Sequence, residues 1–129
     1  MKALTAPRFE AAPAAAGPRV QGFSGRGFVV GSRIYDGVLL TPEAALDWQP
    51  PALADLRPVH VEALLALDPA PEFLLLGTGA AMAFPPRAFT AALEEKGIGV
   101  EAMDSRAAAR TWGLLRGEGR WIAAALMPL

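Results

Sequence analysis

The sequence predicts a single α/β domain of three layers, in which a mixed central β-sheet carries packed helices and follows an antiparallel β meander. Two observations support this prediction. Between residues 72 and 127, apolar strand-like runs alternate with amphipathic helical patterns, as they do in βαβ units. Between residues 20 and 48, short β-type runs are separated by glycine-containing turns, as they are in hairpins. We assign residues 19–129 to this domain, because a chain of 129 residues suffices for one core.

The meander is predicted from short segments in the first half of the chain. Residues 22–30 have the pattern of a strand, a tight turn and a second strand. Residues 33–40 predict one further strand, with a β-bulge near Asp36 and Gly37. Residues 44–48 predict a last short strand before a proline pair. We expect the hairpins to form a second layer or an edge of the main sheet.

The second half predicts helices and strands in alternation. The expected elements are a helix over residues 58–67, a strand over 72–76, a helix over 86–96, a strand over 98–103, a helix over 104–116 and a strand over 120–127. Residues 73–76 and 122–126 are apolar throughout, which is typical of central strands that are covered on both faces.

The helix over residues 104–116 is expected to begin at Asp104, whose side chain suits an N-cap. Its apolar stripe consists of Ala108, Trp112 and Leu115. A second row lies beside that stripe, and we expect both rows to pack on the sheet as one broad face. The second row consists of Ala107, Thr111 and Leu114.

Composition excludes several classes of function. The formal charge is −1, from 12 basic and 13 acidic residues, whereas a protein that binds nucleic acid by neutralising phosphates needs a clustered basic excess. The chain has no cysteine, which excludes disulfides, thiolate catalysis and cysteine-ligated metals. Its one histidine, His60, excludes a multi-histidine metal site and lacks a nucleophile partner. We therefore expect His60 to be a surface or half-buried residue, and we expect no metal and no cofactor.

Residues 1–18 are expected to form a flexible leader, because their Ala/Pro-rich sequence offers little apolar area to bury. The first 17 residues contain no apolar run of the length that a signal peptide needs. No apolar run of about 18 residues, the length that a membrane-spanning helix needs, occurs in the chain.

The turn Gly77-Thr78-Gly79 follows a predicted strand, as the phosphate-binding turn of a dinucleotide site does. Two features oppose that interpretation. Met82 occupies the third glycine position and is too bulky for close packing of helix and strand. Pro85 and Pro86 delay the following helix, so its N-terminus does not lie at the turn. The remaining alternatives are a tight structural turn and a nest of backbone amides that holds a small anion.

Arg106, Arg110 and Gly113 share one face of the predicted helix, because they are spaced four and three residues apart. Two arginines beside an open glycine have the chemistry to grip a carboxylate, a phosphate or an acidic partner. The alternative is a solvated face in which the arginines form ion pairs with Glu101 or Glu118.

The segment Glu118-Gly119-Arg120 joins that helix to the last strand. One interpretation is a turn with an ion pair, and the other is that it completes a polar rim with Thr78 and Arg110. Because the carboxyl ends of parallel strands meet at one edge of a sheet, the strand ends at Gly77 and Met103 are expected to lie close together.

Several segments together resemble one known family. They are residues 28–31, 35–42, Trp48, 74–79, 97–104, 110–112 and 118–126. They resemble the small domain of unknown function shared by many proteobacterial proteins and by the mitochondrial respiratory complex I assembly factor 3. The likeness covers about residues 20–128 and implies a three-layer α/β domain without an established catalytic activity. The chain departs from the family where Ser105 replaces a frequent Thr and Gly113 replaces a frequent Asn.

The resemblance implies a non-enzymatic accessory protein that assists assembly of a respiratory or membrane protein complex through protein–protein contacts. It implies the bacterial cytoplasm, with contact to the inner membrane only through a partner. The alternative is a protein or enzyme that binds a small anionic ligand with residues 77–79 and Arg110. No catalytic residue is assigned. The candidate ligand or partner surface comprises Gly77, Thr78, Gly79, Asp104, Arg106, Arg110, Thr111, Glu118 and Arg120.

Overall fold

The computed structural model describes residues 16–129, which form a single α/β domain with two β-sheets and three α-helices. The smaller sheet is antiparallel and has the order β1-β2-β3 (Val20–Ser24, Gly27–Val30 and Arg33–Tyr35). The larger sheet is mixed and has the order β5-β4-β8-β6-β7. Its strands are β4 (Val38–Leu40), β5 (Ala45–Asp47), β6 (Phe73–Gly77), β7 (Gly99–Met103) and β8 (Ala123–Leu126). The predicted fold class is confirmed.

The prediction of a single bulged strand over residues 33–40 is wrong. The chain leaves β3 at Tyr35 and starts β4 at Val38, and these two strands belong to different sheets. The break lies at Gly37, where a Cβ would approach the Trp48 carbonyl oxygen to 2.5 Å. Trp48 N in turn donates a hydrogen bond to Gly37 O at 3.1 Å. This close backbone approach needs a glycine and redirects the chain from one sheet to the next.

The prediction of two apolar central strands is confirmed. β8 lies at the centre of the larger sheet, between β4 and β6. β6 is parallel to both β7 and β8, whereas β4 is antiparallel to β8. The helix that connects β6 to β7 is α2 (Arg87–Glu95), and the helix that connects β7 to β8 is α3 (Ser105–Gly117). Both connections are βαβ units, as the alternating pattern predicted.

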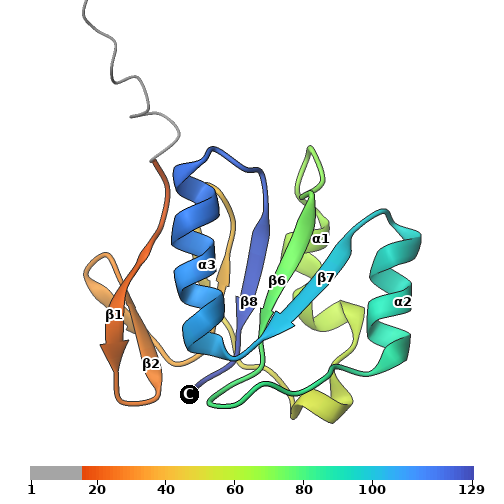
Figure 1. Cartoon of the computed structure of the whole chain (residues 1–129), viewed down its shortest axis with the longest axis horizontal. Helices are drawn as coiled ribbons and strands as arrows, with labels where there is room; N and C mark the ends of the chain where they lie inside the picture. Colours follow the sequence, from red (N-terminus) through yellow and green to blue (C-terminus); the bar gives the residue numbers. More distant parts are fainter. Residues whose placement is uncertain (1–15) are drawn as a thin grey trace, which may run out of the picture.

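The helices cover the two faces of the larger sheet unequally (Figure 1). One face packs against α2 and against α1 (Glu62–Leu65), through a cluster that includes Leu64, Phe89 and Leu93. The opposite face packs against α3 and the small sheet, through a cluster that includes Phe28 and Trp112. We call these the α2 face and the α3 face.

The helix predicted over residues 58–67 is shorter and begins as a 3₁₀ turn over Pro58–Val61, followed by α1. A further 3₁₀ turn, Leu53–Asp55, precedes it. His60 is half-buried: its Nδ1 accepts a hydrogen bond from Arg57 N at 2.9 Å, and its carbonyl accepts one from Trp48 Nε1 at 2.8 Å. The histidine therefore caps a turn, and its half-buried position agrees with the predicted surface or half-buried placement.

The broad apolar face predicted for α3 is wrong on one side. Ala108 and Trp112 are fully buried, but Leu114 is 65% exposed. The buried surface of α3 instead extends toward Ala109, on the flank where the small sheet joins the same core cluster. A helical period defines an apolar stripe, but the neighbouring elements decide which flank of it is covered.

Residues 1–15 of the predicted leader (residues 1–18) lie outside the described part of the chain. Pro18 already contacts the domain, since its carbonyl accepts a hydrogen bond from Trp112 Nε1 at 2.9 Å. Within residues 16–129, no helix has the length and apolar character that a membrane crossing requires.

Candidate functional site

The Gly77-Thr78-Gly79 turn is held by hydrogen bonds from within the chain. Its Thr78 N donates to Met103 O at 2.9 Å, and Gly79 N donates to the Ser105 hydroxyl at 2.9 Å. The Thr78 hydroxyl donates to Ala81 O at 2.8 Å. These bonds occupy the two amides that an anion nest would have to present.

Ser105, the first residue of α3, connects three elements at this turn. It is fully buried, and its hydroxyl accepts from Gly79 N and donates to Met127 O at 2.7 Å. Its own amide donates to Gly79 O at 2.8 Å. A Cβ on Gly77 would lie 2.7 Å from the Ser105 hydroxyl oxygen and 2.9 Å from the Ser105 Cα. The glycine at position 77 therefore permits the close approach of α3 to β6.

Asp104 is the N-cap of α3, as predicted, and its Oδ1 accepts a hydrogen bond from Ala107 N at 2.9 Å. The predicted proximity of the two strand ends is also confirmed, because Gly77 and Met103 are paired in register. Thr111 lies over this end of β7, with its hydroxyl 3.5 Å from Met103 Sδ. The N-terminal half of α3 is thus fixed to the carboxyl ends of β6 and β7.

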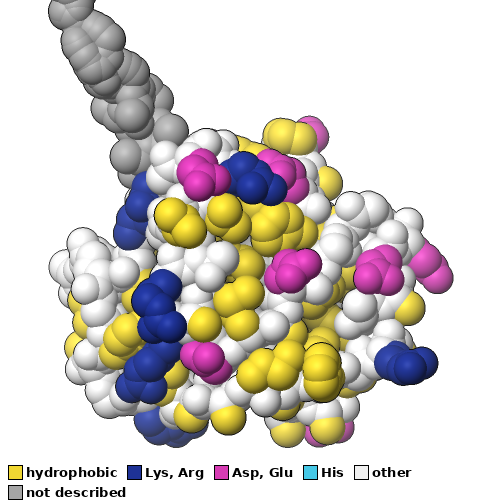
Figure 2. Space-filling view, viewed as in Figure 1, with side chains coloured by type: hydrophobic (Ala, Val, Ile, Leu, Met, Phe, Trp, Pro, Cys, Tyr) yellow, Lys and Arg dark blue, Asp and Glu magenta, His cyan; other side chains and the backbone are white. Residues whose placement is uncertain are grey.

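Arg106 and Arg110 lie on the exposed surface of α3, as predicted. The Arg106 guanidinium stacks over the Phe23 ring at 5.2 Å, which places it beside β1. Within the described residues, Arg110 forms no ion pair or hydrogen bond, and neither arginine pairs with Glu101 or Glu118. Figure 2 shows basic side chains along the line between β1 and α3. Arg110 therefore offers an unoccupied guanidinium to solvent.

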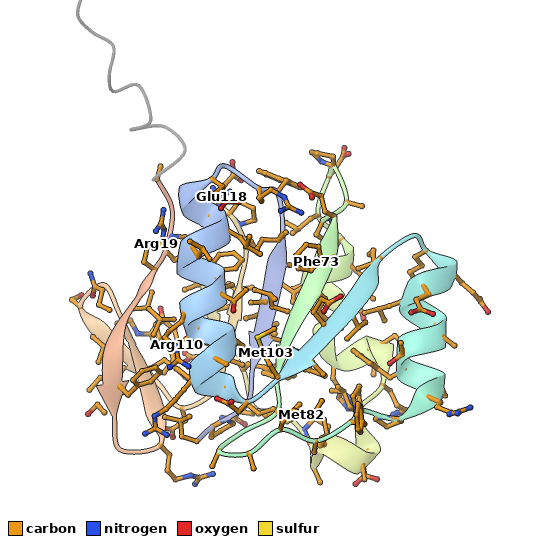
Figure 3. The ribbon with its side chains drawn as sticks, in the orientation of Figure 1. Arg19, Phe73, Met82, Met103, Arg110 and Glu118 are labelled. Carbon is orange, nitrogen blue, oxygen red and sulfur yellow. The ribbon has the colours of Figure 1, made fainter. Side chains whose placement is uncertain are left out.

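Glu118 and Arg120 lie at the opposite end of α3 from the Gly77–Gly79 turn. Glu118 is the C-cap residue of the helix, and Figure 3 shows it at the far end from Met82. Arg120 forms an ion pair with Glu72 at 2.8 Å. This agrees with the interpretation of the segment as a turn with an ion pair, and the structure does not bring Glu118 and Arg120 to the turn.

The Glu72–Arg120 pair perturbs both groups. The hydrogen bond from Arg120 lowers the pKa of Glu72, and the same bond raises the pKa of Arg120. Both side chains are partly exposed, at 40% and 46%, so the pair contributes little to the free energy of unfolding. Close by, Arg116 is buried and donates to Arg120 O; burial lowers its pKa, and the charge of Arg19 lowers it further.

A partly apolar surface between α3 and β7 was missed by the sequence analysis. Leu114 is 65% exposed and Met82 is 46% exposed, whereas Phe73 and Met103 are half-buried. Figure 3 shows Phe73 and Met103 between α3 and β7, with Met82 toward the bottom of the view. We call this the α3–β7 surface; it comprises Phe73, Met82, Met103, Thr111 and Leu114. Of these residues, only Thr111 belongs to the predicted candidate surface. The helical and strand patterns predicted the other four side chains as core or loop, and their unequal coverage reveals the surface.

A separate depression of about 640 Å³ lies on the outer side of α2. Its lining residues are Phe84, Pro85, Arg87, Thr90, Ala91 and Glu94. None of the residues predicted for the candidate surface lines it. This depression therefore adds nothing to the chemistry of the predicted surface.

Comparison with known proteins identifies the family. The model of a protein family of unknown function, DUF498/DUF598, matches residues 20–127. A Danio rerio protein named NADH dehydrogenase (ubiquinone) 1 alpha subcomplex assembly factor 3 is 33% identical over 116 residues, which cover 89% of this chain and 67% of that protein. The Bos taurus protein of the same name is 31% identical, over 84% of this chain and 60% of its own length. An uncharacterised protein of Rhodobacter capsulatus is 35% identical, over 87% and 93% of the two chains.

Solved structures of bacterial proteins have the same fold. A crystal structure of a Bordetella parapertussis protein has a TM-score of 0.77 at 33% identity, over 91% of this chain and 100% of that one. A solution structure of a Xanthomonas campestris protein has a TM-score of 0.74 at 37% identity, over 88% and 86%. The predicted family resemblance is confirmed: the chain belongs to the DUF498/DUF598 family of proteins of unknown function.

Proposed function

We propose that this chain is a non-enzymatic accessory protein that assists the assembly of a respiratory or membrane protein complex through protein–protein contacts. The observation that carries the proposal is its similarity to relatives named as assembly factors, at 33% identity over 89% of this chain in one case. The chain spans about two thirds of the length of those relatives, so the shared part is the domain described above.

The exposed chemistry of α3 supports a contact surface for a protein. Arg110 has no intramolecular partner among the described residues, and Leu114 exposes 65% of its surface one turn further along the helix. Arginine is enriched at protein interfaces relative to the rest of the protein surface. The partner is a protein, and the proposed location is the cytoplasm, with membrane contact only through that partner.

The test is affinity capture of the tagged full chain from its own cells, with Arg110→Glu alongside. We expect a stoichiometric protein that is lost or strongly reduced with the variant, because the substitution reverses an exposed charge that has no ion-pair partner among the described residues. The Arg110→Glu variant should unfold at the same temperature as the parent, since Arg110 is exposed. A partner that binds both chains equally would contradict the placement at Arg110, and a chain that captures no protein would contradict the proposed function.

The alternative function, binding of a small anion, depends on Arg106 and Arg110 more than on the turn, because the amides of Thr78 and Gly79 are bonded internally. A panel of anionic metabolites in a thermal unfolding assay tests it. A rise of several degrees at saturating ligand would favour it, whereas a uniform absence of response would leave the assembly function as the better explanation.

A further inference from the structure

Within residues 16–129, the two sheets have four edge strands, and three of them are short or covered. In the small sheet, β1 lies against α3, where the Arg106 guanidinium stacks over the Phe23 ring at 5.2 Å. β3 and β5 have three residues each, and an ion pair of 2.8 Å between Arg33 and Asp47 joins them. Short edges and edge charges protect a sheet from pairing with other chains. The fourth edge is β7, which has five residues and ends the larger sheet (Figure 1).

The pairing of β7 with β6 shows which backbone groups of β7 are free. Met103 O accepts a hydrogen bond from Thr78 N at 2.9 Å, so the backbone groups of Met103 point toward β6. Because this direction alternates along a strand, the groups of Glu101 also point toward β6, whereas those of Val100 and Ala102 point outward. Among the described residues, the N–H and C=O groups of Val100 and Ala102 have no hydrogen-bond partner.

The outer side of β7 is open to solvent. Val100 and Ala102 are half-buried, whereas Leu74 and Leu76, their register partners on β6, are 1% and 0% exposed. Glu101, between the two half-buried residues, is exposed and forms no ion pair within the described part of the chain. Free backbone groups of an edge strand are satisfied by water or by a further strand. β7 is therefore a template for one more strand, with a carboxylate at its centre.

We propose that β7 pairs with an extended segment of a protein partner, which adds a strand to the larger sheet and carries a basic side chain opposite Glu101. The proposal rests on the proposed function and names a contact in addition to Arg110. The five residues of β7 span about 17 Å, so about five residues of the partner pair with it. Backbone hydrogen bonds to Val100 and Ala102 hold the segment, and the residue between these bonds lies opposite Glu101. An opposite charge at that position stabilises the pairing.

A second copy of this chain fits the edge poorly. Two β7 strands related by a two-fold axis through their centres would place one Glu101 directly opposite the other, and like charges in that position are unfavourable. A shift of the register in one direction would need Ile98 N, which already donates to Leu93 O at 3.0 Å. A shift in the other direction would need Asp104 O, which already accepts from Ala108 N at 2.9 Å. Charge and hydrogen bonding therefore favour a different chain with a basic residue.

The first part of the test asks whether the edge is free in the purified full chain. Amide hydrogen exchange is measured by NMR for the four residues Val100 to Met103. We expect the amides of Glu101 and Met103 to exchange at least about a hundredfold more slowly than those of Val100 and Ala102, because only the former bond to β6. Equal protection of all four amides would show that the chain itself or a second copy already pairs with the edge, which would overturn the proposal.

The second part identifies the segment in cells that naturally make the full chain. The photo-reactive amino acid p-benzoylphenylalanine replaces Gly99, where an added Cβ meets only Phe73 Cβ, at 3.8 Å. This position leaves Glu101 in place. The control position is Leu46, which is 39% exposed on β5, the opposite edge strand of the same sheet. We expect position 99, and not position 46, to form adducts with one segment of one partner, in which a lysine or arginine lies within a strand-like pattern.

The third part measures that segment as a synthetic peptide bound to the purified full chain. Methylation of single peptide amides should abolish binding at every second residue and leave it unchanged at the residues between, since alternate amides face β7. On binding, the amides of Val100 and Ala102 should become protected from exchange. This alternation is specific to strand pairing, because a peptide held only by its side chains does not depend on alternate amides.

Two variants of β7 test the backbone and the charge separately. Ala102→Pro removes an outward N–H without breaking a bond to β6, and should weaken the affinity at least about tenfold. Its matched control is Ala45→Pro on β5, which should leave the affinity unchanged. Since Trp48 N bonds to Gly37 O, the amide of Ala45 also points outward by alternation. Glu101→Lys should weaken binding about three- to tenfold, and a peptide with its basic residue changed to glutamate should restore it, even if Ala102→Pro fails to fold.

Other outcomes overturn the proposal. Adducts with a second copy, or with residues 1–15 of the same chain, would show a different occupant. A peptide that tolerates methylation at every amide, or that Ala45→Pro weakens as much as Ala102→Pro does, would also overturn it. If affinity capture yields a protein but position 99 forms no adduct with it, this edge is refuted and the assembly function stands. If neither capture nor cross-linking yields a protein, the proposed function fails together with the edge.

Discussion

The N-terminal end of α3 and its flank toward β7 belong to one helix but meet opposite surroundings. At the end, Ser105 is fully buried, and its hydroxyl accepts a hydrogen bond from Gly79 N and donates one to Met127 O. On the flank, Leu114 is mostly exposed and Thr111 is half-buried. The end therefore contributes to stability, and the flank is available for recognition. Substitutions at the end should lower the free energy of unfolding, and substitutions on the flank should change only what the protein binds.

The largest effect is expected from Gly77→Ala. The added Cβ would lie 2.7 Å from the Ser105 hydroxyl and 3.0 Å from Leu126 Cδ2, in a region without room to relax. We expect a loss of about 3 kcal/mol in the free energy of unfolding, the upper end for overpacking. Urea unfolding followed by tryptophan fluorescence measures it. A loss well below 1 kcal/mol would show that α3 can shift away from β6 and that the end is not tightly closed.

The next largest effect is expected from Ser105→Ala. The substitution leaves Gly79 N and Met127 O buried without their hydrogen-bond partner. Leaving such groups unsatisfied costs about 2 kcal/mol. The control is Ser32→Ala in the exposed turn between β2 and β3, which should change stability by less than about 0.5 kcal/mol. Equal losses of stability in the two variants would contradict the inference that the buried Ser105 hydroxyl stabilises the fold more than an exposed serine does.

A smaller effect of opposite sign is expected from Gly113→Ala, at a half-buried position of α3. A Cβ there meets no atom within 4 Å, and the residue lies inside the helix. Alanine should therefore stabilise the protein by about 0.8 kcal/mol, the difference in helix propensity. Thermal unfolding measures the change. A destabilised variant would indicate that the added methyl group disturbs the hydrogen bond from Arg19 Nη1 to Gly113 O.

The smallest effect is expected from Glu72→Gln, beside the α3–β7 surface. Arg120 lowers the pKa of Glu72 in the folded protein below the ordinary value of 4.5. The pair therefore stabilises the folded state above pH 4.5, and this contribution is lost as the pH falls from there through the lowered pKa. Melting temperatures of the two proteins should differ slightly at pH 7 and converge at lower pH. A difference that persists at low pH would assign the effect to the packing of the side chain at position 72 instead of to its charge.

The secondary structure from residue 72 onward was predictable, because its strands and helices have complete local signals. The predicted helix over residues 104–116 has an N-cap and an apolar stripe whose residues are spaced as in an α-helix. The observed helix α3 has nearly the same bounds. The strand over 33–40 lacked such a signal. Its division at Gly37 depends on how closely the Trp48 backbone approaches, which is a long-range contact that no local pattern encodes.

The sequence predicted which residue types are candidates for binding, but not how these residues are arranged in space. The exposure of Arg106 and Arg110 followed from helical spacing. The internal bonding of Thr78 and Gly79 did not, because it requires knowing that α3 begins directly above the turn. The separation of Glu118 from that turn follows from the length of α3, which places them at opposite ends.

By itself the sequence determined the fold class, the two apolar central strands, the N-cap at Asp104 and the family, since periodicity, capping and motif order are properties of neighbouring residues. Only the tertiary structure decided which flank of α3 is covered and that Ser105 closes the turn at Gly77. Both depend on atoms that are brought together from distant parts of the chain: β1 beside one flank of α3, β7 uncovered beside the other, and Met127 at the end of β8 within 2.7 Å of a hydroxyl on α3. Burial is a property of the packed elements together, so a sequence pattern predicts which residues can be buried and the packing selects those that are.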